Sequence, residues 1–474
     1  MRALGYCILA IGVLIFPSVE ARGQATTAPK SGDSQSQKKD AEVSPSNTPP
    51  GEGSKASSAT SKEEPSSTSP AKVDAAAAKP FDFWSSKNLT GDWGGLRNKL
   101  KDDGVTVDLF LNQQFQQNFH GGLRVHDAQQ LSGSYDLDIA LDFGKLGLWK
   151  DAGFFMRAGK GTWTDGLNPK RVEALMNVNA DAGGNHVISV EKWWYWQKFL
   201  DKKIELRLGM LTTNKDLFDV GAYANHEDKD FLNRGSIRDM TIPHRTGLGG
   251  FVKFQPIDWF YFQMAGVDAQ SLPRRTGFDT AFHRQALFVG LWEMGVTPKW
   301  SSAKGPMPGN LRLGWWYDPN SKPLFTDTLG GRRLAGTKAS DSGYYLGADQ
   351  MVWKENDDAK DTQGLGVYAR YGHAHADSNK ITDYWAVGMS YKGLIPTRDQ
   401  DVTAFGVAQS ILSERYGDEI HPFADRETVY EWYYSYQLTP CIIISPDFQV
   451  VENPGGDRIA HDAIIGGVRV RIIF

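Results

Sequence analysis

The chain has 474 residues with 52 basic and 56 acidic side chains, and its formal net charge of −4 gives no sign of a polyanionic partner. The mean hydropathy is −0.43. Beyond the first residues no apolar run is long enough for a transmembrane helix, which excludes a helical membrane bundle. A transmembrane β-barrel is not excluded, because its outward and inward residues cancel in any average.

The first residues have the pattern of a secretory signal peptide. A basic residue precedes an apolar stretch at 4–16, and small residues follow it. We predict a signal peptide at 1–21, although cleavage after Ala25 fits equally well, and a retained anchor is the alternative. Cys7 leaves with such a peptide, so Cys441 has no partner for an internal disulfide.

The next segments are predicted to lie outside the folded core. Residues 22–80 are rich in Ser, Pro, Ala and Lys and contain almost nothing apolar, so this leader is expected to be disordered. A periplasmic tether is the alternative for it. Residues 81–104 form a separate N-terminal segment with a short helix that begins between Trp93 and Leu96, with Asp92 as its cap.

The region 105–474 is dominated by alternating apolar and polar residues. In the stretch 131–143, for example, Leu137 and Ile139 point to one face while Asp136 and Asp138 point to the other. Side chains alternate along a β-strand, so each such stretch predicts a strand with one apolar and one wet face. Thirteen residues reach roughly 43 Å, enough to cross a bilayer at a tilt.

Sixteen such stretches recur. They begin near Val105, Leu131, Gly153, Val187, Lys203, Thr246, Trp259, Ala286, Gly309, Gly343, Gly364, Thr382, Asp401, Thr428, Cys441 and Ala463. Their connections are alternately short and long, and aromatic residues gather near the strand ends. This pattern is typical of an all-β transmembrane antiparallel barrel with short periplasmic turns and long extracellular loops. A count of fourteen or eighteen strands remains open, and a soluble β-core is the alternative fold.

The longest predicted loop, 212–245, is polar and charged. Such a loop either folds inward and narrows a pore or covers the outer rim. The sequence does not decide between the two.

Four motifs in order resemble the OprB-type carbohydrate-selective porins. They lie at Gly91-Asp-Trp-Gly-Gly-Leu-Arg97, 391–401, 427–434 and 446–456. The similarity extends from about residue 89 to residue 474. It implies a sixteen-stranded, monomeric outer-membrane barrel that lets sugars diffuse into the periplasm, with a constriction built by in-folded loops and charged wall residues. Phe474 matches the signature by which the barrel-assembly machinery recognises its clients.

A sugar channel needs hydrogen-bonding groups for hydroxyls and flat apolar faces for sugar rings, with weak binding overall. Inward positions supply such groups. The candidate constriction residues are Arg157, Glu205, Arg207 and Glu431, with Trp163 and Trp193 as stacking surfaces and Glu191 next, because the alternation across 190–197 is ambiguous. For each charged residue the alternative is a structural ion pair in the wall.

No catalytic motif is present, so we do not expect an enzyme, a cofactor, a metal or a nucleic-acid partner. The pair His373-Ala-His375 is predicted to lie at an exposed strand end rather than in a metal site. The sequence therefore predicts a carbohydrate porin in the outer membrane of a Gram-negative bacterium. The alternatives are a general or anion-selective porin, or an envelope protein with a structural or adhesive role.

Overall fold

The computed structural model describes residues 81–162, 164–183, 189–270, 287–325, 328–329, 332–333, 336–358, 361–416 and 425–474. The predicted signal peptide and leader, and Trp163, lie outside these residues. The main strands are β1 (Val105–His120), β2 (Gln129–Asp142), β3 (Ala152–Thr162), β4 (Ser189–Phe199), β5 (Ile204–Thr212), β6 (Thr246–Ile257), β7 (Phe260–Asp268), β8 (Phe288–Val296), β9 (Lys299–Ser302), β10 (Gly305–Asp318), β15 (Asp341–Lys354), β16 (Gly364–Ala374), β17 (Ile381–Lys392), β18 (Val402–Leu412), β19 (Arg426–Thr439), β20 (Ile442–Glu452) and β21 (Ala463–Ile473).

Shorter elements lie between or before these strands. They are the helices α2 (Leu96–Asp102) and α3 (Arg234–Ile237), a single π-helical turn (Asn168–Val172), a 3-10 turn (Pro454–Gly456), and the short strands β11 (Lys322–Pro323), β12 (Thr328–Leu329), β13 (Arg332–Arg333) and β14 (Thr337–Lys338). Within the described residues no helix is long and apolar enough to cross a membrane.

The main strands form one closed antiparallel barrel. Consecutive strands pair with each other, except that β8 and β9 both pair with β10, and β1 also pairs with β21, which joins the first strand to the last. β8 and β9 pair with consecutive parts of β10 and together make one transmembrane strand. The described residues thus give sixteen transmembrane strands, which confirms the predicted fold.

The alternation of the sequence corresponds to the two faces of the wall. On β1 the inward side chains of Asn112 and Gln114 are fully buried, whereas the outward Phe115 is 43% exposed. Phe115 lies opposite Leu131 of β2, and Gln114 lies opposite Ser132. Apolar side chains therefore gather on the outer face, where they meet lipid, and polar side chains gather inside.

The predicted strand starts agree with the structure to within four residues. The largest difference is at β10, which begins at Gly305 rather than Gly309. Its first four residues pair with the short strand β9, and prolines at positions 306 and 308 interrupt the alternating pattern there.

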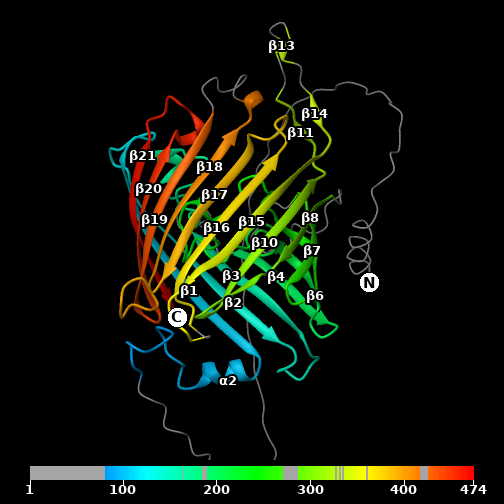
Figure 1. Cartoon of the computed structure of the whole chain (residues 1–474), viewed down its shortest axis with the longest axis vertical. Helices are drawn as coiled ribbons and strands as arrows, with labels where there is room; N and C mark the ends of the chain where they lie inside the picture. Colours follow the sequence, from blue (N-terminus) through cyan, green and yellow to red (C-terminus); the bar gives the residue numbers. More distant parts are fainter. Residues whose placement is uncertain are drawn as a thin grey trace, which may run out of the picture. The chain divides into compact units, whose positions relative to one another are not determined.

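Short and long connections lie at opposite ends of the barrel. The turns after β4 and β19 span only 200–203 and 440–441, whereas β5 and β6 are separated by 213–245. Figure 1 shows β11, β13 and β14 at one end of the wall and α2 at the other. By the usual asymmetry of outer-membrane barrels, the long loops mark the extracellular end.

The N-terminal segment contacts the last strand. Arg97 Nη2 donates to the carbonyl oxygen of Phe474 (2.7 Å), and the Arg97 guanidinium lies 4.4 Å from the centre of the Trp93 ring. The residue at the N-cap of α2 is Gly95, with a φ of 92° and no side-chain cap. The sequence prediction of Asp92 as the cap is therefore wrong: its backbone oxygen, not its side chain, accepts bonds from Gly95 and Arg97.

Candidate pore constriction

Two long loops fold into the barrel. In the β3–β4 loop, Asp181 Oδ2 accepts hydrogen bonds from Gln114 Nε2 of β1 (2.7 Å) and Ser134 Oγ of β2 (2.6 Å). The carbonyl oxygen of Val178 accepts one from Gln449 Nε2 of β20 (3.0 Å). These bonds fix the loop to the inner wall. They also give hydrogen-bond partners to polar side chains of the wall that the loop buries.

The β5–β6 loop, 213–245, is held by buried ion pairs. Its Asp219 lies 2.9 Å from Arg312 of β10 and 3.0 Å from Arg370 of β16. The Asp219 backbone N–H also donates to Glu293 of β8 (2.9 Å). The loop therefore folds inward, which settles the alternative that the sequence left open.

An apolar core lies between these loops and the wall. The Phe231 ring packs edge-on against Tyr433 of β19 and Tyr368 of β16, with ring centres 5.0 and 6.0 Å apart. Met176 of the β3–β4 loop and Ile237 of α3 belong to the same buried cluster. One side of the interior is thus packed protein rather than channel.

Partly exposed charges lie on the other side of the interior, along β2 to β6. The side chains of Arg157 and Arg207 are 15% and 25% exposed, whereas those of Arg312 and Arg370 are at most 1% exposed. All four are on strands and face inward. Of these four arginines, the two on β3 and β5 therefore reach solvent, whereas the two on β10 and β16 do not.

Arg157 of β3 is the centre of a cluster of carboxylates. Its Nε and Nη2 donate to both oxygens of Asp138 at 2.7 Å, and Nη1 lies 3.2 Å from Asp136 Oδ2. The fork geometry of the guanidinium suits such bidentate pairing. Glu191 Oε2 lies 3.9 Å from Arg157 Nη1, which places this predicted residue in the same cluster.

The β5–β6 loop adds Asp216 to this region. Lys192 Nζ of β4 lies 2.6 Å from Asp216 Oδ2. Burial disfavours ionisation of Asp216, but Lys192 and Lys215 outweigh it and hold the pKa of this carboxyl well below its usual range. The sequence prediction did not include Lys192 or Asp216, because only the fold brings this loop to β4.

Arg207 and Glu205 of β5 form a second, partly exposed charged group on the inner wall. Arg207 Nε donates to Glu205 Oε1 (2.7 Å). The Arg207 guanidinium lies 5.6 Å from the ring centre of Trp194. Trp194 stacks on Phe155 of β3 with ring centres 4.4 Å apart. A flat aromatic surface and a charged pair therefore adjoin on the inner wall.

A β-bulge in β4 explains the ambiguous alternation at 190–197. Arg157 pairs with Lys192 and Ala158 pairs with Val190, so the strand register skips Glu191. The extra residue lets both Glu191 and Lys192 reach the inner side. A bulge of this kind cannot be recognised from the alternation of apolar and polar residues in the sequence.

The structure corrects the placement of Trp193. Lys192 and Trp194 face the interior, so Trp193 between them faces outward, where its ring stacks on Phe154 (6.3 Å between centres). The neighbouring Trp194 has the inward position that was predicted for Trp193. Trp163, the other predicted stacking residue, lies outside the described residues.

Glu431 also differs from the prediction. Its side chain is fully buried, and Oε1 accepts the backbone N–H groups of Leu232 (2.6 Å) and Asn233 (3.0 Å). It therefore anchors the β5–β6 loop and does not face an open pore. Its inward position was correctly predicted from alternation, but the loop that covers it was not.

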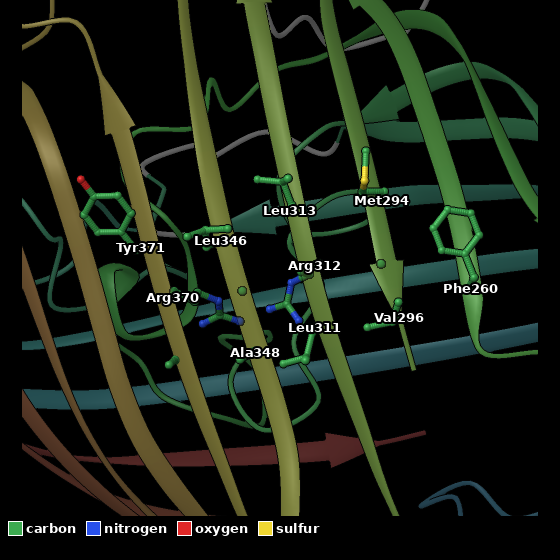
Figure 2. Close-up of a pocket in the computed structure, with 13 residues that line it drawn as sticks. Phe260, Met294, Val296, Leu311, Arg312, Leu313, Leu346, Ala348, Arg370 and Tyr371 are labelled. Atoms are coloured by element: carbon green, nitrogen blue, oxygen red, sulfur yellow. The ribbon is translucent and has the colours of Figure 1, made fainter. Parts of the chain in front are cut away.

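Two other features lie outside these charged groups. A groove of about 500 Å³ between β7 and β16 is lined mainly by apolar side chains such as Leu313 and Leu346, and Figure 2 shows them together with Arg312 and Arg370, which also line it. This groove is on the outer wall. His373 contacts Asp383 (2.9 Å), and within the described residues no group of three or more His, Cys, Asp or Glu could hold a metal ion.

His244, at the end of the β5–β6 loop, gives a pH prediction. Burial, with Arg238, Arg234 and Lys215 nearby, lowers its pKa to about 3. Below the ordinary value of 6.5 the unfolded chain binds a proton that folded His244 does not, so this residue's stabilisation is lost as the pH falls from about 6.5 to about 3. We expect His244→Gln to flatten the decline of thermal stability over that range, measured by unfolding scans.

His375→Gln is the control for this prediction, because His375 lies in the β16–β17 connection and not in the in-folded loop. Asp239 titrates in the opposite sense, since burial raises its pKa to about 7. The readout is therefore the difference between each variant and the parent protein. An identical slope in His244→Gln and the parent would contradict the assignment.

Comparisons with known proteins agree with this architecture. The family model described as carbohydrate-selective porin, OprB family, matches residues 124–474. Porin B of Pseudomonas aeruginosa is 23% identical over 425 residues, which cover 82% of this chain and 92% of that protein. The high-pH structure of Pseudomonas putida OprB is 22% identical, with a TM-score of 0.73, and covers 83% of this chain and 100% of its own.

The low-pH structure of the same Pseudomonas putida protein has a TM-score of 0.53 at 20% identity, with the same coverage. These structural likenesses support the barrel fold, and the family model matches most of the chain. The chain therefore belongs to the carbohydrate-selective porins of the OprB family.

Proposed function

We propose that sugars cross this barrel along β2–β6 and are selected beside Arg157, Glu191, Glu205 and Arg207. The protein is a carbohydrate porin of the Gram-negative outer membrane. The observation that carries the finer assignment is the contrast in exposure between these inward charges and the fully buried Arg312 and Arg370. Only groups in contact with water can exchange hydrogen bonds with a passing solute.

The chemistry of this wall suits a neutral, hydroxyl-rich solute. Arginine donates several hydrogen bonds and a carboxylate accepts several, so the Arg207–Glu205 pair can exchange one partner for sugar hydroxyls. Trp194 supplies a flat apolar face beside them. Passive transport requires that such contacts stay weak enough for the solute to leave.

An anion-selective pore is less well supported by the charges. Around Arg157 there are four carboxylates, of Asp136, Asp138, Glu191 and Asp216, and three cations, of Arg157, Lys192 and Lys215. This excess of acidic groups disfavours anions. Reversal potentials in a salt gradient test the point, and strong anion selectivity would favour the anion channel over the sugar channel.

We also propose that the barrel acts as a monomer, and that Phe474 is recognised by the assembly machinery before its carbonyl oxygen is bound by Arg97. No reaction step is assigned to the lumen, because porins of this fold transport solute without chemical change. Crosslinking in native outer membranes tests the oligomeric state.

The principal test is single-channel recording in planar bilayers while neutral sugars are titrated. We expect the sugars to reduce the ion current, and liposomes to swell faster with sugars than with amino acids of equal size. If no sugar affected the ion current, the claim of sugar selectivity would fail and the protein would be a general porin.

Neighbouring tryptophans give a matched test of the sugar-stacking surface. Trp194→Ala should weaken the block of the current by sugar roughly 2- to 10-fold, the range expected for loss of one aromatic contact. Trp193→Ala should leave the block unchanged, because its ring packs on Phe154 on the outer wall. Equal effects of the two substitutions would remove Trp194 from the proposed site.

A further inference from the structure

A basic pocket lies at the extracellular end of β2 and β3. It has a volume of about 470 Å³. Its lining includes Arg124, Gln130, Thr164, Asp165, Lys170 and Arg171. None of these residues belongs to the sugar-selecting group that we propose on β3, β4 and β5.

The neighbours of the pocket place it on the inner side of the barrel rim. Gln130 of β2 pairs with Gln116 of β1, an inward side chain that is 1% exposed. Asn118, the next inward side chain on β1, donates from Nδ2 to the backbone oxygens of Arg124 (3.0 Å) and Arg171 (3.4 Å). The pocket therefore lies within the mouth of the barrel and not on its lipid side.

Backbone hydrogen bonds fix the two loops that carry the basic residues. The carbonyl oxygen of Arg171, in the π-helical turn, accepts the N–H groups of Leu123 (2.9 Å) and Arg124 (3.2 Å). The β1–β2 loop is thus bonded to the β3–β4 loop. Because these bonds use backbone atoms, they hold the segments of Arg124 and Arg171 together whatever side chains those positions carry.

The pocket has an excess of positive charge. Three cations and the single carboxylate of Asp165 give a formal charge of +2 (3 − 1). Within the described part of the chain, Arg124, Lys170 and Arg171 form no ion pair with a carboxylate. Arg171 Nε donates to the backbone oxygen of Asp127 (3.2 Å), which orients its guanidinium. Such a site attracts an anion.

The pocket is separate from the acidic group around Arg157. On β2, the inward positions run from Gln130 at the pocket to Asp136 in the acidic group. These positions are six residues apart, which is roughly 20 Å at about 3.3 Å per residue. A solute that enters from outside therefore meets a basic site at the mouth before it meets an acidic one deeper in the barrel.

We propose that this pocket binds the phosphate group of a sugar phosphate at the barrel mouth. A phosphate monoester carries a charge of about −1.5 to −2 at neutral pH, which matches the charge of the pocket. Arginine pairs with two phosphate oxygens at once, and lysine adds a point charge. Gln130 and Asp165 can bond the sugar hydroxyls. The acidic group further inside opposes onward passage of the same anion, so the pocket holds this ligand without favouring its transport.

The test is calorimetric titration of the full-length protein in detergent with glucose 6-phosphate, at about 0.15 M salt so that distant charges are screened. A hydrogen bond to a charged group contributes roughly tenfold or more in affinity. Arg124→Gln with Lys170→Gln should therefore weaken binding at least about tenfold, whereas Lys170→Arg should keep it. Arg458→Gln is the matched control, since Arg458 is an exposed arginine of the β20–β21 loop that pairs with Asp425.

Glucose and inorganic phosphate are titrated in parallel, and a thermal unfolding midpoint equal to that of the parent shows that each variant is folded. Binding of glucose 6-phosphate that the double variant leaves unchanged, or that glucose equals, would overturn the proposal. Inorganic phosphate that binds as tightly would make free phosphate the ligand and reject the sugar phosphate, whereas weaker binding supports it. Block of the ion current by neutral sugar tests the path along β2–β6 separately, because that path can fail while the pocket still binds.

Discussion

Asp219→Asn is expected to lower the free energy of unfolding by about 3–5 kcal/mol, because breaking a buried ion pair leaves a charge uncompensated. Asp219 contacts both Arg312 and Arg370, and its side chain is 1% exposed. Arg312 keeps Asp349 as a partner, but Arg370 loses its carboxylate. The same change frees one anchor of the β5–β6 loop, so the single-channel current should become larger and noisier. Unfolding in denaturant and bilayer recordings measure the two effects.

Asp377→Asn is the matched control for this prediction. Asp377 makes an ion pair of 2.9 Å with Arg415, but the two side chains are 43% and 49% exposed. Exposed pairs contribute at most about 1 kcal/mol, so the control should be close to the parent in stability and in current. Equal losses in the two variants, or a quiet current in Asp219→Asn, would mean that the loop does not depend on this anchor.

Arg157→Gln is expected to change the ion selectivity of the pore more than any other single substitution in the wall. It leaves Asp136, Asp138 and Glu191 without the cation that they share. Charge of one sign in a narrow, poorly solvated passage concentrates the opposite ion. The reversal potential in a salt gradient should therefore move severalfold in permeability ratio toward cations, and sugar block should weaken because one of the proposed hydrogen-bond donors is gone.

Lys202→Gln is the matched control, because it also removes one positive charge but at a position where we expect no effect on ion selectivity. Lys202 lies in the turn after β4, is 67% exposed and is 3.7 Å from Asp151. Its reversal potential should equal that of the parent protein. An unchanged reversal potential in Arg157→Gln as well would assign Arg157 to a structural role in the wall.

Part of the pore lining could be predicted from the sequence of each strand taken alone. Arg157, Glu205 and Arg207 occupy inward positions because residues alternate along a strand, and this local rule needs no knowledge of the partner strands. The rule was insufficient at β4, where the bulge at Glu191 shifts the following residues by one position. Trp194 rather than Trp193 therefore faces the interior. A bulge depends on the register with β3, which is a property of two strands together.

The sequence by itself determined that the chain forms a barrel, where its strands begin, and which side of each strand is polar. Strand periodicity and turn spacing are local properties, so they are visible without a structure. Only the tertiary structure decided which inward side chains meet water. Glu431 and Arg207 have the same pattern in the sequence, yet the in-folded loop covers one and not the other. Burial results from contacts between residues far apart in the chain, here about 200 positions, and no periodic pattern contains that information.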